Sequence, residues 1–348
     1  MQAAIILSRG LHLAGMLSFL GVAAFRTLVL PAASDIPASL RGRVDRLGWV
    51  SLVLAIAAGG LWLAVEAASM AGAASVSETL RALPLVAEAT RFGQVMMARF
   101  ALLLFGGLAF RWWRWPALGF IVLAAALQGL MAHAGAAEGD GAPLVAEALH
   151  LPAAGIWFGS LLPLFLSVGK LAPADGAAVC ERFTPIGLAC VLVIGVTGTI
   201  QAITLVGSVP GLVGTPYGHI VLLKLGLFTA ALGLALLNRL WLTDRLAADG
   251  RAGPLRLSVA TEALLGCGIV LAAGWLASGM PAIDRKPVRP ASLSWSIPRR
   301  GDPSAGYASA GYGPFTGQTA PVAGIPAAGI PAVGISTDNW LISRAASS

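Results

Sequence analysis

Long apolar runs separated by short polar or charged segments dominate most of the chain. Each run is close to the ~20 residues that a helix needs to cross ~30 Å of hydrocarbon. The alternation of a half-buried strand is missing, and a lone strand in lipid could not satisfy its backbone hydrogen bonds. The pattern therefore predicts eight transmembrane helices, over residues 5–30, 47–70, 92–110, 115–133, 144–168, 185–206, 218–242 and 258–279.

The composition agrees with this pattern, because 57% hydrophobic and only 11% charged residues cannot make a water-soluble surface. We predict an all-α fold, a polytopic membrane helix bundle over residues 1–281. The first run is too long for a signal peptide, lacks a basic start and contains His12, so we expect a retained helix. Residues 282–348 are rich in Gly, Pro, Ala and Ser, with a near-repeat over 322–336, and we expect a disordered tail.

The loop charges predict the orientation, because Lys and Arg are retained on the cytoplasmic side. The connections after the first, third, fifth and seventh helices hold twelve Lys and Arg residues, whereas the opposite set holds three. Both ends of the bundle are therefore expected to face the periplasm of a bacterial inner membrane. The twelve are Arg26, Arg41, Arg43, Arg46, Arg111, Arg114, Lys170, Arg182, Arg239, Arg245, Arg251 and Arg256.

Several function classes are disfavoured. The net charge of +7 reflects topology and a basic tail, with no soluble basic domain for nucleic acid. Cys180, Cys190 and Cys267 have no CxxC spacing and fall within helices or on the cytoplasmic side, so neither a disulfide nor structural zinc is expected. No GxxxxGK[ST] motif supports an ATP-driven pump, and we expect no enzyme activity.

The candidate metal ligands gather on the predicted periplasmic side. His12 lies inside the first helix with Met16 one turn deeper on the same face. Met131 and His133 end the fourth helix, His150 lies in the first turns of the fifth, and His219 opens the seventh. None of these residues falls in the cytoplasmic half. This sidedness indicates metal handling at one membrane face.

Imidazole and thioether donors suit copper, particularly Cu(I). A histidine in hydrocarbon is also costly unless it is hydrogen-bonded, liganded or beside a water-filled cavity. The alternative for each histidine is a hydrogen bond to a neighbouring helix, and for His219 the two interpretations are equally supported. Each methionine alone is more often packing than ligand. Copper binding is therefore predicted from the set His12, Met16, Met131, His133, His150 and His219.

Four charged residues lie at membrane depth and need pairing, water or an interfacial position: Glu66, Arg99, Lys224 and Glu262. A cation near a copper path repels the ion unless a carboxylate neutralises it. If Lys224 contributes to function, we expect a carboxylate partner, with Glu66 the nearest candidate.

Three segments carry a family resemblance: RGLHLAGMLSFLGVAAFR in the first helix, MAHAGAAEGDGAPLVAEALHLPAAGIWFGSLLPL across the fourth loop and fifth helix, and RFTPIGLACVLVIGVTGTIQAITLVGSVPGLVGTPYGHIVLLKLGLFTAALGLALLNR near the C-terminal end. Together they resemble the copper resistance protein D (CopD) family over residues 9–281. The most distinctive stretch runs from TPYG through Lys224 to Asn238 and Arg239.

The resemblance implies an inner-membrane protein of about eight helices that takes part in copper uptake or tolerance. It also implies a periplasmic CopC-like copper-binding protein as a partner, which must be separate because no such domain is fused here. The matching positions are His12, His133, His150, the TPYG motif and Glu262. The first helix departs from the family in reading MLSFLG from Met16, where the family has histidine, an aromatic residue and glycine.

The resulting hypothesis is that His133, His150 and nearby methionines capture copper at the periplasmic mouth. The ion then passes His12 and Met16 through weak successive sites, since a tight site would block flow. The alternative is a b-type haem held between histidines on separate helices, which would make an electron carrier. His133 and His150 are compatible with one such haem. A third interpretation is a scaffold or sensor that docks a periplasmic partner.

Overall fold

The structure is a computed structural model that describes residues 2–31, 36–131, 141–276 and 283. These residues form helices and loops, with no strand among them. The elements are α1 (Gln2–Ala24), the π-helical η1 (Phe25–Val29), α2 (Ala38–Ala71), α3 (Val76–Ala89), α4 (Arg91–Phe110), α5 (Arg114–Ala126), the 3₁₀ segment η3 (Leu127–Met131), α6 (Gly141–Gly159), α7 (Leu161–Val168), α8 (Pro173–Val206), α9 (Val209–Gly214), α10 (Pro216–Leu237), the π-helical η5 (Asn238–Leu242), α11 (Thr243–Asp249) and α12 (Ala252–Leu276).

Every predicted apolar run becomes helix where the structure describes it, and the fold is the predicted multi-pass helix bundle. Within the described ranges, seven helical spans are long and apolar enough to cross a membrane. The predicted fourth helix is the shorter apolar segment Arg114–Leu130. The predicted tail, residues 282–348, lies outside the described residues apart from Ile283.

Some boundaries differ from those predicted. Helix α2 begins at Ala38 and α8 at Pro173, well before their apolar runs, because their polar first turns continue the helix beyond the hydrocarbon. The fifth run is divided at Ser160 into α6 and α7. Two short helices, α3 and α9, lie in connections where no helix was predicted.

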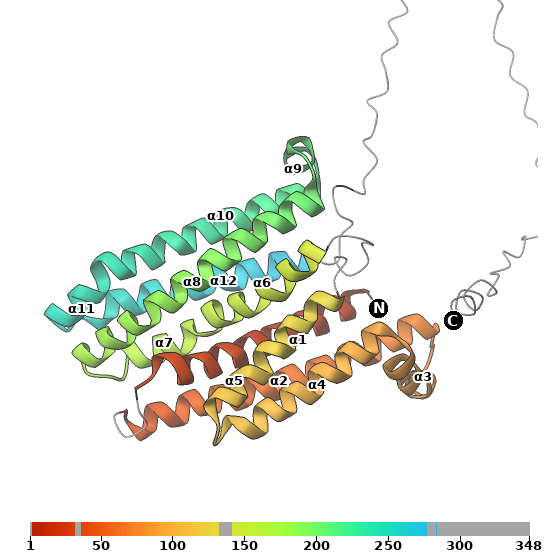
Figure 1. Ribbon diagram of the computed structural model, residues 1–348, viewed down its shortest axis with the longest axis horizontal. Helices are drawn as coiled ribbons and strands as arrows, with labels where there is room; N and C mark the ends of the chain where they lie inside the picture. Colours follow the sequence, from red (N-terminus) through yellow and green to blue (C-terminus); the bar gives the residue numbers. More distant parts are fainter. Residues whose placement is uncertain (1, 32–35, 132–140, 277–282, 284–348) are drawn as a thin grey trace, which may run out of the picture. The chain divides into compact units, whose positions relative to one another are not determined.

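The spans run side by side, so the bundle has two distinct ends (Figure 1). The start of α1, α3 and α9 lie at one end, which we call the α9 end. The α6–α8 connection and α11 lie at the other, the α11 end. The candidate histidines of α1, α6 and α10 therefore lie in helix segments that start from the α9 end.

Helix α1 lies between the N-terminal helices α2 and α5 and the later helix α6, so it joins the two parts of the bundle. A Cβ atom on Gly21 would overlap the backbone of Gly159, and one on Gly159 would overlap the carbonyl oxygen of Leu17. Glycine is therefore required at both positions. The Ser160 hydroxyl adds a hydrogen bond of 3.1 Å to the Gly21 carbonyl oxygen. This close contact fixes α1, which carries His12.

Candidate metal site in the membrane interior

His12 lies in the interior of the bundle and is 0% exposed. Its Nδ1 is 2.7 Å from the carbonyl oxygen of Ala55 on α2. The ring lies 5.9 Å from the Trp62 ring and 6.3 Å from the Phe100 ring, measured between centroids. Three helices, α1, α2 and α4, therefore define the position of one imidazole.

Small residues on α2 make room for this imidazole. A Cβ on Gly59 would lie 2.6 Å from His12 Nδ1 and 2.7 Å from Cε1 of Phe100. Gly15, one turn from His12 on α1, would place a Cβ 2.7 Å from the backbone nitrogen of Ala55. Both glycines allow α1 and α2 to approach closely enough for the His12–Ala55 hydrogen bond.

This hydrogen bond determines which ring nitrogen of His12 is available. A carbonyl oxygen only accepts, so Nδ1 must carry the proton and donate to Ala55. Nε2 is then the nitrogen with the lone pair, and it is buried with no hydrogen-bond partner among the described residues. Metal-binding histidines typically have this arrangement, with one N–H held by a carbonyl group and the other nitrogen facing the ion.

Met16 lies one turn deeper on α1 and is also 0% exposed. Its sulfur accepts a hydrogen bond of 3.1 Å from Nη2 of Arg99, and Nη1 of Arg99 donates to the side-chain oxygen of Gln128. Arg99 itself is fully buried. The thioether therefore contacts a cation in this structure, and Arg99 would have to turn away before Met16 could bind copper.

His150 is placed in α6 against α8, and its Nδ1 lies 2.9 Å from Oγ1 of Thr197. The Thr197 hydroxyl proton is directed at the Val193 carbonyl oxygen, 2.6 Å away. The hydroxyl oxygen must therefore accept from His150, which puts the proton on Nδ1 and the lone pair on Nε2. A hydrogen bond from Nδ1 orients the His150 ring as it does that of His12, but the acceptor is a threonine hydroxyl instead of a backbone carbonyl.

His219 differs from both because its side chain is exposed and bonded locally. Its Nε2 lies 2.8 Å from the carbonyl oxygen of Val213, near the end of α9. The neighbouring TPYG motif is a helix start: Thr215 Oγ1 accepts from the Gly218 amide at 3.0 Å, and a Cβ on Gly218 would overlap the Leu212 carbonyl oxygen. The motif thus stabilises the beginning of α10.

Oppositely charged side chains interact near the α9 end. Lys224 on α10 interacts electrostatically with Glu147 on α6, and Glu147 also interacts with Arg9 on α1. Arg9 interacts with Glu66 on α2 as well. Glu147 is thus the carboxylate that acts on Lys224, where the sequence suggested Glu66. Glu262, deeper in α12, accepts a hydrogen bond of 3.2 Å from Asn238.

The structure places His12 and Met16 one turn apart on α1. His150 lies separately on α6, and His219 lies at the surface. His133 lies outside the described residues, as does the side chain of Met131. Among the described residues, no three His, Cys, Asp or Glu side chains come together as a metal site. The sequence identified Arg99 as a charged residue at membrane depth, but it did not predict that Arg99 contacts Met16 and Gln128 or that Thr197 contacts His150.

Comparison with known proteins supports the copper assignment at the family level. Residues 1–144 match the copper resistance protein D-like N-terminal domain, and residues 177–276 match the family described as copper resistance protein D. Copper transport protein CutJ of Bacillus subtilis is 32% identical over 136 residues, which cover 37% of this chain and a quarter (25%) of that protein.

Copper resistance protein D of Pseudomonas syringae pv. tomato is 30% identical over 284 residues, which cover 71% of this chain and 90% of that protein. No solved structure matches the chain. The second relative is matched over nearly its whole length. The chain therefore belongs to the copper resistance protein D family.

Proposed function

We propose that this chain carries copper into or across a bacterial inner membrane, with the α9 end facing the periplasm. Family membership supports copper as the cargo. The orientation is supported by the loop charges, because Arg26, Arg41, Arg111 and Arg114 lie together at the opposite end of the bundle. Both ends of the helix bundle then face the periplasm, where a separate CopC-like protein would deliver or accept the ion.

The observation that carries this proposal is Nε2 of His12, which lies inside the membrane span and has no hydrogen-bond partner in the part of the chain that the structure describes. A buried ring nitrogen without a hydrogen-bond donor is costly in hydrocarbon, and a soft cation is a ligand that removes that cost. The aromatic rings of Trp62 and Phe100 keep the site apolar, which favours copper over a strongly hydrated ion.

His150 is the second copper-binding residue in this proposal. Its Nδ1 is bonded to Thr197, which leaves the lone pair on Nε2, and its helix starts from the same end of the bundle as that of His12. His133 and Met131 complete the entry site, as the sequence predicts. Copper near His12 must also coexist with Arg99, and this repulsion weakens the inner site, as release requires.

Radioactive copper accumulation in cells tests the proposal. Cells that express the wild type should differ from the empty vector, and His12→Gln should remove that difference because the amide offers no imidazole lone pair. His219→Gln is the matched control, since that exposed histidine is bonded to a local turn. Equal accumulation in the wild type and the empty vector would remove the transport proposal.

The haem alternative depends on His133 and His150, of which only the second lies within the described residues. A visible absorption spectrum of the purified protein distinguishes copper transport from haem binding. We expect copper by metal analysis and no reduced-minus-oxidised haem band; a sharp band would instead assign electron transfer.

A further inference from the structure

A cavity of about 260 Å³ opens at the α11 end of the bundle, remote from His12. It lies between η1, the first turns of α2 and the connection from α4 to α5. Its polar lining consists mainly of guanidinium groups from three separate chain segments. The residues that bear on its chemistry are Arg26, Arg41, Arg111, Arg114, Asp45 and Trp112.

The charge of this lining is strongly positive. Four arginines face one carboxylate, and that carboxylate, Asp45, forms an ion pair of 3.3 Å with Nε of Arg26. Among the described lining residues, Arg111 and Arg114 add positive charge beyond the Arg26–Asp45 ion pair. Retention of a loop in the cytosol requires positive charge somewhere in that loop, but it does not require four guanidinium groups around one cavity.

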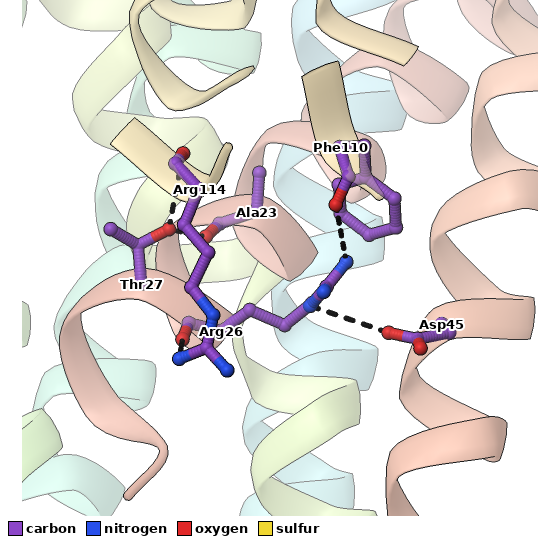
Figure 2. Close-up of polar contacts among 6 residues, drawn as sticks. All are labelled: Ala23, Arg26, Thr27, Asp45, Phe110 and Arg114. Atoms are coloured by element: carbon purple, nitrogen blue, oxygen red, sulfur yellow. Dashed lines mark hydrogen bonds and ion pairs between the residues drawn. The ribbon is translucent and has the colours of Figure 1, made fainter. Parts of the chain in front are cut away.

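The inner wall of the cavity is held by hydrogen bonds (Figure 2). Arg26 Nη1 donates to the Phe110 carbonyl oxygen at 3.0 Å, and the guanidinium lies 4.1 Å from the centre of the Phe110 ring. Arg114 Nη1 donates to the Arg26 carbonyl oxygen at 3.1 Å. Because these contacts already order Arg26 and Arg114, a ligand would bind with less loss of side-chain entropy than at mobile surface arginines.

Tryptophans place the cavity at the level of lipid headgroups. Trp112 lines it and is 71% exposed, and its neighbours Trp113 and Trp115 are 65% and 67% exposed. Exposed tryptophans beside the end of a membrane span typically lie at the boundary between hydrocarbon and headgroups. An anion that enters the cavity from this boundary would be the phosphate of a lipid.

We propose that this cavity binds an anionic phosphate group, supplied by the headgroup of an anionic lipid in the adjacent leaflet. Guanidinium groups match phosphate oxygens with paired N–H donors, which makes arginine the suitable residue for such a site. The same chemistry would accept free phosphate, so the experiment has an arm for each source.

Binding is measured on the purified full chain in detergent, by native mass spectrometry with phosphatidylglycerol or phosphatidylcholine and by calorimetry with inorganic phosphate. The test variant is Arg41→Gln with Arg111→Gln. The matched control is Arg239→Gln with Arg251→Gln, which removes two exposed arginines outside the cavity. We expect the test variant to lose phosphatidylglycerol affinity by about thirtyfold and the control to keep it.

Phosphatidylglycerol should bind more tightly than phosphatidylcholine. If inorganic phosphate alone binds and shows the same loss in the test variant, the site stands with a free anion as its ligand. Equal affinity for both lipids without phosphate binding, or equal losses in the test and control pairs, would overturn the proposal. Arg41→Lys with Arg111→Lys keeps the charge but not the paired donors, so it should lose less affinity than the glutamine pair, which separates charge loss from misfolding.

Discussion

The N-terminal and C-terminal parts of the bundle differ in how deeply their helices are buried. In the first three spans, α1 with η1, α2 and α4, 44–50% of the apolar window is buried. In the last three, which begin with α8, α10 and α12, the buried share is 22%, 6% and 28%. The span that contains α10 is the most hydropathic of the seven and the least buried. In lipid, the most apolar helix is thus the peripheral one.

This difference follows from the solvent. Lipid chains are as apolar as a protein core, so hydropathy cannot direct a leucine inward, whereas a polar side chain gains by leaving the lipid. The fully buried His12 and Arg99 belong to the N-terminal part, while His219 on α10 is exposed. The N-terminal part should therefore contain the more constrained site, and the contact between α1 and α6 should hold the two parts together.

The largest expected effect is on that contact. Gly159→Val would push a side chain into the backbone of α1 at Leu17 and Gly21, where no flexible side chain can yield. Overpacking costs about 1–3 kcal/mol even where side chains can adjust, so we expect a loss above that range. The variant should lack a monodisperse peak in detergent and show a greatly lowered thermal transition.

Gly119→Val on α5 is the control, because a Cβ there meets nothing within 4 Å. It introduces the same side chain on the exposed face of an apolar helix. If both variants lower the thermal transition equally, Gly159 at the α1–α6 contact matters no more for stability than an exposed glycine does. If Gly159→Val is stable, the two parts are not held together at this point.

The next effect concerns the His12 site. Gly59→Ala would place a methyl group 2.6 Å from Nδ1, displacing the ring and breaking its bond to Ala55. Loss of such an orienting contact reduces metal affinity by about 10- to 100-fold, and we expect the upper end of this range in a site closed by three helices. Copper titration of the purified protein measures it.

Gly60→Ala, the adjacent residue, is the control, since its Cβ would lie in open space. A similar copper affinity in the wild type and both variants would separate His12 from copper binding. A similar decrease in both variants would point to a general effect on α2, not to the histidine.

The sequence predicted the helices well because a span of lipid demands about twenty apolar residues wherever it occurs. It also placed His12 and Met16 on one face of one helix, since that depends only on local periodicity. It did not predict that Arg99 contacts Met16 or that Thr197 contacts His150, because these pairs are 83 and 47 residues apart and depend on how the helices pack. It also did not predict which helix is peripheral, because both environments are apolar.

The smallest of the three effects is expected at His150, whose side chain is only partly buried, whereas that of His12 is fully buried. Thr197→Val keeps the shape of the side chain and removes the oxygen that accepts from Nδ1–H of His150. The ring then loses its preferred tautomer and orientation, although the imidazole remains. We expect copper affinity to fall by about tenfold, the lower end of the range for an orienting partner.

Two further variants test whether the missing hydroxyl causes the loss of affinity. Thr197→Ser restores the hydroxyl and should restore the affinity, whereas Thr199→Val removes a hydroxyl that is bonded to the Gly195 carbonyl oxygen on an exposed face and should have no effect. A tenfold loss that serine does not restore would indicate altered packing of α8. If Thr197→Val weakens copper binding more than Gly59→Ala does, the dominant site is the one at His150, and full burial of the histidine ring would then not predict where the ion is held.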